Sequence, residues 1–264
     1  MKKFKLLVTM MLIAIIASFS SCKKKGCMDP NSFTFNPEAK KDDGSCTTPE
    51  AVKKSLIFKK TATWCPYCGD WGTSYSTDIT NAHANCQVIA LHGDSEFEST
   101  LGDNIMDALP SSGWPHFFAG TEDISNSYYE LNSAVNSELG KAVEVAMAIE
   151  KSPSASSINV RVQSQWLGSI DGEFFIAVYL LENGQIAEQQ IAGSSADPNF
   201  VHNNVLRAEA NNSPFGVPVT INGDGYLLDV NIDLSSSWVA ANCYPVAVMW
   251  KKNGSSYDFI NFVK

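Results

Sequence analysis

The sequence is short of positive charge and of long apolar runs, and each shortage excludes a class of protein. It has 19 lysines and arginines against 28 aspartates and glutamates, which gives a formal net charge of −9. Proteins that bind nucleic acid need clustered Lys and Arg to meet the phosphates, so no nucleic-acid partner is expected. After the N-terminal apolar stretch, no segment is apolar enough to span a bilayer, so no membrane-spanning helix is expected.

A second Cys-x-x-Cys pair is also missing, which argues against a structural zinc site. Such a site uses four ligands, usually supplied as two such pairs. Cys65 and Cys68 form the single pair in this sequence, and His83 with Cys86 is a poor substitute for another. We therefore expect no metal, and the chemistry predicted below needs no organic cofactor.

The first residues have the order of a secretory signal. Lysines at positions 2, 3 and 5 precede an apolar stretch at residues 6–19, and two serines then lead to Cys22. A cysteine after small residues resembles a bacterial lipobox, which implies that residues 1–21 are removed and that Cys22 is acylated, with palmitate as a typical chain. Such a lipid would hold the protein to a membrane surface. The alternative is an ordinary signal peptide cut near Ser20, with Cys22 a plain thiol. Loss of residues 1–21 takes the net charge to about −12.

Residues 22–50 are predicted to form a tether followed by a small module with one disulfide. The stretch from Cys27 to Cys46 is rich in turn-forming residues and has almost no core beyond Phe33 and Phe35. A unit of this size needs a covalent staple. A Cys27–Cys46 disulfide would stabilise it by about 3 kcal/mol, because the bond restricts the unfolded loop.

Residues 51–140 are predicted to form a small α/β layer. An apolar, β-like run at Ser55–Thr61 leads into the cysteine pair, and Gln87–Leu91 has the pattern of a buried second strand. The spacing of apolar residues predicts helices from the cysteine pair to about residue 84, near residues 101–109, and over residues 128–139 with Gly140 as C-cap. Alternating strands and helices are typical of an α/β fold.

Residues 141–264 are predicted to form an all-β antiparallel sandwich. Apolar residues here alternate with polar ones, as from Ile158 to Val162 and from Leu228 to Leu234. Phe174–Leu181 is apolar on both faces, so it should be a central strand. Asp-Gly and Asn-Gly pairs predict hairpin turns, because both residues tolerate positive φ; these pairs begin at positions 171, 183, 224 and 253. Short alternating strands with such turns indicate a sandwich.

The spacing of Cys65 and Cys68 suits thiol–disulfide exchange. At the start of a helix, free N–H groups and the helix dipole stabilise a thiolate and lower its pKa. The second sulfur lies one turn away and can resolve a mixed disulfide. Trp64 should shield one side of the motif and leave Cys65 the more exposed cysteine. We predict Cys65 as nucleophile and Cys68 as resolving thiol; the alternative is a disulfide that is only structural.

The segment Trp64–Gly69, after a strand and with Pro115 downstream, resembles the thioredoxin-fold proteins over about residues 51–140. The resemblance implies that Pro115 is a cis-proline that opens a strand facing the cysteines and contacts bound substrate. The ordinary alternative is a trans proline at a strand start. Thioredoxins carry a buried acid six residues before the first cysteine, and this chain has Lys59 there. Efficient reductase turnover is therefore not expected.

The order of the predicted domains is similar to a family of twenty-eight-kilodalton outer-membrane lipoproteins, in which a thioredoxin-like domain precedes a β-sandwich. The segment Val201–Arg207, followed by Gly216, is similar to that family's signature between two strands. This segment is either structural or a binding site. In the structural interpretation it is a polar loop with a helical turn, Val205 and Leu206 fill the sandwich, and Arg207 pairs with an acid.

Two functions stay open from the sequence. The first is an outer-membrane-associated lipoprotein that exchanges disulfides with the thiols or disulfides of other exported proteins. The second is a non-catalytic surface or adhesion module in which the Cys65–Cys68 pair is structural. The family resemblance implies an outer-membrane location, with the face of the membrane left open. Cys86 and Cys243 either form a disulfide or stay buried as small apolar residues.

Overall fold

The computed structural model describes residues 23–264 except residues 31, 33, 125, 126, 222 and 224. The predicted signal at residues 1–21, the lipidation site Cys22 and the predicted core residue Phe33 lie outside the described residues. The chain divides after Thr48 into two compact units, each described by itself.

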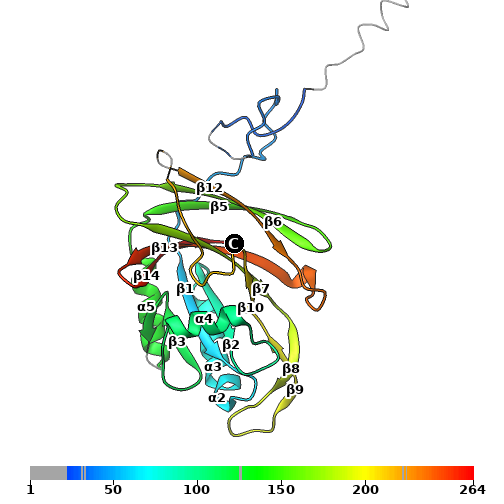
Figure 1. Ribbon diagram of the computed structural model, residues 1–264, viewed down its shortest axis with the longest axis vertical. Helices are drawn as coiled ribbons and strands as arrows, with labels where there is room; N and C mark the ends of the chain where they lie inside the picture. Colours follow the sequence, from blue (N-terminus) through cyan, green and yellow to red (C-terminus); the bar gives the residue numbers. More distant parts are fainter. Residues whose placement is uncertain (1–22, 31, 33, 125–126, 222, 224) are drawn as a thin grey trace, which may run out of the picture. The chain divides into compact units, whose positions relative to one another are not determined.

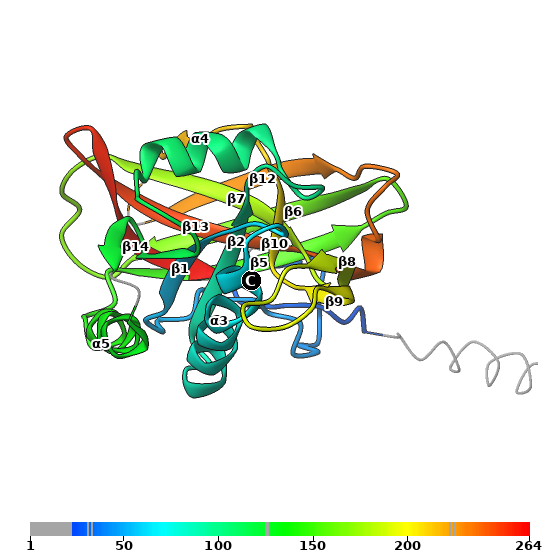
Figure 2. The ribbon, with the colours of Figure 1, turned by 90° about the horizontal axis from the view of Figure 1, so that it is seen from below.

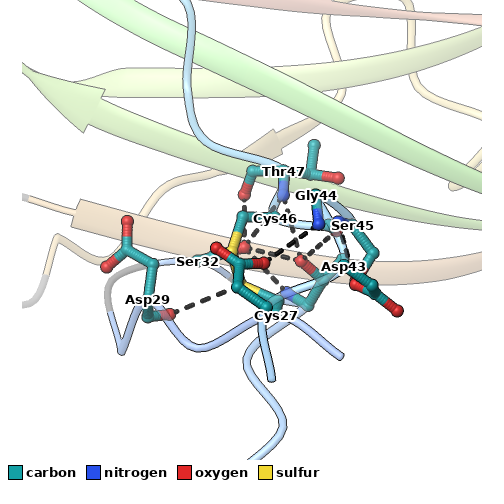
Figure 3. The surroundings of a disulfide bond; sticks show 10 residues. Cys27, Asp29, Ser32, Asp43, Gly44, Ser45, Cys46 and Thr47 are labelled. Carbon is teal, nitrogen blue, oxygen red and sulfur yellow. Dashed lines mark hydrogen bonds between the residues drawn. A yellow bond between two sulfur atoms is a disulfide. The ribbon is translucent and has the colours of Figure 1, made fainter. Parts of the chain in front are cut away.

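The first unit is a small module held by a disulfide and by polar contacts. Cys27 is bonded to Cys46, as predicted, and Cys27 is fully buried. The Ser32 hydroxyl donates to the Thr47 carbonyl over 2.7 Å and accepts from the Thr47 N–H over 3.0 Å, as Figure 3 shows beside the disulfide. These contacts join the turn at Ser32 to Thr47, the residue after Cys46.

The second unit, residues 49–264, begins with alternating strands and helices. These are β1 (Ser55–Thr61), α2 (Pro66–Gly69), α3 (Trp71–Ala82), β2 (Cys86–His92), α4 (Thr100–Ala108), β3 (His116–Ala119), β4 (Glu122–Ile124) and α5 (Tyr128–Leu139). The predicted strands and the helices near residues 101–109 and 128–139 are confirmed. The helix after the cysteine pair differs from the prediction, because it is broken at Asp70 into α2 and α3.

The rest of the unit is almost entirely β-structure. Its elements are β5 (Val145–Pro153), β6 (Ser157–Trp166), β7 (Phe174–Glu182), β8 (Gln185–Gln189), β9 (Asp197–His202), β10 (Val205–Glu209), β11 (Val217–Pro218), β12 (Gly225–Asp233), a 3-10 turn η1 (Ala240–Asn242), β13 (Cys243–Asn253) and β14 (Ser256–Val263). The Asn253-Gly254 pair forms the predicted β13–β14 turn, with Gly254 at φ 61°.

One mixed sheet organises residues 49–264. Its strand order is β14-β13-β7-β10-β2-β1-β3-β4, with β11 also paired to β7. The β1–β2 and β2–β10 pairs are parallel, and the other pairs along this order are antiparallel. The sequence predicts separate units at residues 51–140 and 141–264; the structure joins strands from both ranges in this sheet, because β10 lies between β2 and β7.

A three-stranded sheet, β12-β6-β5, packs against part of the large sheet (Figure 1). Strand β7 is central, as predicted, and its two faces belong to different cores. Ile176, Val178 and Leu180 face the β5–β6–β12 layer, whereas Ala177, Tyr179 and Leu181 face a core that includes β1, β2 and α4. Burial on both sides explains why this strand is apolar throughout.

Helices cover both faces of the sheet around β1 and β2. Figure 2 shows α4 on one side of these strands and α3 and α5 on the other. Ile79 of α3 and Leu131 of α5 pack with Ile57, and Ile105 of α4 packs with Phe58. Of the helices that the structure describes, none is both long and apolar enough to cross a membrane.

Candidate functional site

Cys65 and Cys68 lie at the first turn of α2, which follows β1 after a short connection. Cys65 is the N-cap residue and Pro66 takes the first helical position, where its missing N–H costs nothing. The two cysteines form a disulfide. The backbone N–H of Cys68 donates to the Cys65 sulfur over 3.2 Å. An N–H aimed at this sulfur would also stabilise the Cys65 thiolate after reduction.

Both cysteines are buried, which differs from the prediction that Cys65 is the more exposed. Cys65 is 2% exposed and Cys68 is 1% exposed. Their neighbours Trp64 and Tyr67 are 46% and 56% exposed. The prediction considered the shielding by Trp64 alone, and the structure shows a second cover that comes from a distant part of the chain.

That cover is the β8–β9 hairpin. The side-chain amide of Gln189 donates to the carbonyls of Ala62, Thr63 and Cys65 over 3.0 to 3.3 Å. The backbone of the loop between β8 and β9 adds two bonds, from the Gln190 N–H to the Thr63 carbonyl and from the Ala192 N–H to the Pro66 carbonyl.

The sequence did not single out Gln189. It lies 124 residues from Cys65, and no motif in the sequence links the two positions.

Gly69 and Gly72 let other elements approach the motif closely. A Cβ on Gly69 would lie 2.4 Å from the Gln190 carbonyl oxygen, and one on Gly72 would lie 2.6 Å from Cγ of Pro115. The Trp114–Pro115 peptide bond is cis, and Pro115 immediately precedes β3. Pro115 therefore packs on α3 at Gly72, a residue that follows Cys68 closely in the sequence. Its contact with substrate stays a prediction.

Aromatic rings surround the exposed side of the motif. The Trp64 and Trp114 rings meet edge to face with their centroids 5.7 Å apart. The Lys60 ammonium lies 4.4 Å from the centroid of the Trp114 ring. Trp114 also packs against Cys65, Cys68 and Ala62. Indole surface therefore lies beside the disulfide.

Lys59, at the position of the thioredoxin acid, is buried in the middle of β1. Its register partners are Ala90 on β2 and Phe117 on β3. No carboxylate pairs with it among the described residues. Burial without a counter-charge lowers the pKa of the Lys59 ammonium to about 7.

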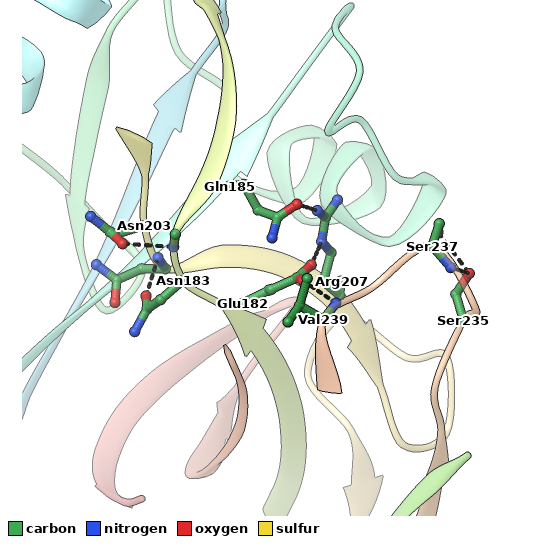
Figure 4. A network of polar contacts seen from close by, with 10 residues as sticks. Glu182, Asn183, Gln185, Asn203, Arg207, Ser235, Ser237 and Val239 are labelled. Carbon is green, nitrogen blue, oxygen red and sulfur yellow. Dashed lines mark hydrogen bonds and ion pairs between the residues drawn. The ribbon is translucent and has the colours of Figure 1, made fainter. Parts of the chain in front are cut away.

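The signature segment Val201–Arg207 is mainly structural in its contacts. It spans the end of β9 and most of β10 rather than the expected helical turn. Val205 and Leu206 are buried, as predicted. Arg207 donates to the buried Glu182 over 2.7 Å and to Gln185 over 3.0 Å, so the predicted pairing with an acid is confirmed (Figure 4).

Asn204 explains why this segment forms no helical turn. Its φ is 58°, a conformation that asparagine tolerates better than most residues. Its carbonyl accepts from the Ala90 N–H on β2, and its side chain accepts from Tyr244 on β13 and from Gln87. Gly216 has φ 77°, and a Cβ there would overlap the Ile176 carbonyl at 1.8 Å. Asn204 thus links the start of β10 to β2 and β13, and Gly216 allows close approach to β7.

Cys86 and Cys243 do not pair. Both are free thiols, Cys86 buried and Cys243 half-buried. Burial raises the pKa of Cys86 to about 12 and that of Cys243 to about 11, so neither is an activated thiol. Among the described residues, no group of three or more His, Cys, Asp or Glu side chains is arranged to hold a metal ion.

Comparisons with known proteins place the chain in a family. The profile of the family described as "Outer membrane protein Omp28" matches residues 120–264. HBP35 of Porphyromonas gingivalis has a similar structure, with 12% identity and a TM-score of 0.70 over 82% of this chain and 76% of that chain, which shows a shared fold. A search of curated proteins found no match.

A second solved structure, a domain of the outer membrane lipoprotein Omp28 from Porphyromonas gingivalis, matches 46% of this chain and 88% of that chain. Its identity is 20% and its TM-score is 0.31. The family profile, in contrast, covers more than half of the sequence. This chain therefore belongs to the Omp28 family of outer membrane proteins.

Proposed function

We propose that this outer-membrane protein exchanges disulfides with cysteines of other exported proteins through Cys65 and Cys68. We further propose that residues 51–140 supply a thioredoxin-like framework for the pair. Support for the framework comes from the parallel β1–β2 pair, the antiparallel β1–β3 pair, the helix that follows the cysteines and the position of Pro115 against that helix.

The observation that carries the redox proposal is the contact between the Cys68 N–H and the Cys65 sulfur. A donor fixed at this sulfur stabilises negative charge on it, so Cys65 is the better leaving group and the better thiolate of the pair. Trp64 and Tyr67 are exposed beside it and offer apolar surface to an extended substrate.

The exchange reaction balances without a cofactor. A substrate thiolate attacks the Cys65 sulfur, forms a mixed disulfide and releases the Cys68 thiolate. A second substrate thiolate then attacks the substrate sulfur, which releases Cys65 as thiolate. The substrate is oxidised to a disulfide, and the Cys65–Cys68 disulfide is reduced to a dithiol; the reverse sequence reduces a substrate disulfide.

We also propose that acylation of Cys22 holds the protein to the outer membrane, because the residues before it have the order of a lipoprotein signal. Mass spectrometry of the N-terminal peptide should show an acylated Cys22. An unmodified Cys22 thiol at this position would contradict the anchor.

A trapping experiment tests the redox function. A Cys68→Ser variant cannot resolve the mixed disulfide, so Cys65 should accumulate covalent adducts with exported proteins, visible as bands that disappear on reduction. Every variant in this experiment should also carry Cys86→Ser and Cys243→Ser, because Cys86 and Cys243 are free thiols that would form adducts of their own. The matched control is Cys65→Ser, which should trap far fewer partners. Equal trapping by the two variants, or none by either, would contradict Cys65 as nucleophile.

A second candidate function rests on the burial of both cysteines. A disulfide covered by the β8–β9 hairpin is protected from reductants, as expected of a structural bond in a non-catalytic surface module. The two functions differ in redox potential, because a structural disulfide in an exported protein has a potential below roughly −300 mV.

A further inference from the structure

A polar cavity of about 270 Å³ lies between α3, the strands β1 and β2, and the β8–β9 hairpin. Lys59, His92 and His202 line it, together with hydroxyl-bearing residues of α3 such as Thr77. The mechanism proposed for the cysteines uses none of these side chains. The volume is at the small end of ligand sites and can hold a small molecule or several waters.

The basic side chains of this cavity are buried, and each histidine has one unpaired ring nitrogen among the described residues. Lys59, His92 and His202 are each less than a tenth exposed. His92 Nδ1 and His202 Nε2 are buried with no hydrogen-bond partner among the described residues. Buried polar atoms are usually paired, so these two nitrogens beside the cavity are available to a ligand.

The two histidine rings are fixed in place by their surroundings. Their centroids are 5.5 Å apart, and the Phe97 ring lies 5.1 Å from His92 and 5.0 Å from His202. The Phe200 ring also lies against His202, with the centroids 4.9 Å apart. A site whose side chains are already oriented loses little conformational freedom when a ligand binds.

The described lining of the cavity offers no negative charge to compete with an anion. None of the described residues that line it is an Asp or Glu. Burial lowers the pKa of His202, and the charge of Glu96 acts in the opposite direction by a smaller amount. The Glu96 carboxylate already accepts a hydrogen bond from the Thr63 hydroxyl over 3.0 Å. The Arg207 guanidinium, which pairs with Glu182, adds to the positive field at His92.

We propose that this cavity binds a small oxyanion with a carboxylate or phosphate group, held by Lys59, His92 and His202. The Lys59 ammonium supplies a charge-assisted hydrogen bond. One ring nitrogen of His202 already donates to the Ala187 backbone, so Nε2 donates to the anion when the imidazole is protonated, and bound anion favours that form. Burial lowers the pKa of His92 first, and the positive charges of His202, Lys59 and Arg207 lower it further. A bound anion would offset that field. The proposal is independent of the redox function.

The test is a titration of the full chain, carrying 13C-labelled histidine, with inorganic phosphate and separately with acetate. The four histidines give an internal control, because His83 is bonded to Asn132 and His116 to Asp123. Millimolar anion should shift the imidazole signals of His92 and His202 and leave those of His83 and His116 in place. Equal or absent shifts for the four histidines with both anions would overturn the proposal.

Variants locate the site. Lys59→Met should weaken binding of the effective anion by about tenfold or more. Lys60→Met is the matched control, since Lys60 is the next residue on β1 and its ammonium lies over Trp114 instead; it should change the dissociation constant by less than about twofold. Unchanged binding by Lys59→Met would overturn the proposal. Should Lys59→Met fail to fold, the wild-type titration still decides the outcome. Binding should persist in a Cys65→Ser/Cys68→Ser variant, which separates this site from the redox chemistry.

Discussion

Lys59 lies in an environment that a charged side chain does not favour. It sits in β1 without a counter-charge, and burial lowers its pKa from 10.5 to about 7. The unfolded chain holds this proton up to pH 10.5, whereas the folded chain releases it near pH 7. The unfolded state therefore binds more protons between these values, and the contribution of Lys59 to stability rises with pH across that window.

Lys59→Met should remove this pH dependence. The free energy of unfolding of the wild type, minus that of the variant, should rise by about 1.4 kcal/mol per pH unit from about pH 7 to about pH 9. Urea unfolding at several pH values, in a buffer without phosphate or carboxylate, measures the difference. Parallel pH profiles for the two proteins would show that Lys59 keeps an ordinary pKa in the folded state.

At the scale of elements, the β8–β9 hairpin bonds to the backbone around the disulfide, and we expect it to limit access of reductants. The Gln189 side-chain amide of the hairpin donates hydrogen bonds to the carbonyls of Ala62, Thr63 and Cys65. Loss of a neutral hydrogen bond costs about 1 kcal/mol net, so loss of this side chain should favour the open hairpin.

Gln189→Ala should therefore speed reduction of Cys65–Cys68 by dithiothreitol by about fivefold to tenfold. The control is Gln190→Ala, since the Gln190 side chain bonds to Glu188 on the hairpin itself. Stopped-flow reduction, followed by the fluorescence of nearby Trp64 and Trp114, measures the rate. Equal rates for the two variants would mean that the hairpin does not limit access.

Local elements could be predicted from the sequence where the apolar pattern is strong. The strand at Ser55–Thr61 and the helix at residues 128–139 follow from that pattern, and β7 is central because it is apolar on both faces. The contact of Gln189 with Cys65 and the pairing of Val205 with Ala90 could not be predicted, because a sequence pattern does not specify which distant segments meet.

The same limit applies to the cavity. His92 and His202 lie in different halves of the chain, and their positions are fixed by the joining of β2 and β10 in one sheet. From the sequence, Lys59 stands out only because it takes the position of the buried acid of thioredoxins. Its place beside two histidines depends on the tertiary fold.

At the scale of the whole molecule, residues 51–140 and 141–264 both contribute strands to the large mixed sheet and side chains to one core. Leu56 and Phe58 on β1 and Leu91 on β2 pack with Tyr179 and Trp250, which come from the C-terminal half. Large apolar side chains stabilise by about 1.5 to 3 kcal/mol each when buried, so separation of the two halves would be costly.

A fragment of residues 51–140 should therefore fail to fold alone, whereas residues 49–264 should unfold in one cooperative transition. Circular dichroism and amide proton dispersion measure both. A fragment with native-like dispersion and a cooperative melt would support an independent domain that ends near residue 140.

The central claim is that Cys65 and Cys68 exchange disulfides with other proteins. The measurement that tests it most directly is the reduction potential of this pair, from equilibration with glutathione buffers and quantitation of the reduced thiols. We predict a potential between about −120 and −270 mV, the range of thiol–disulfide exchange proteins. A potential below roughly −300 mV would contradict the claim and identify the bond as structural.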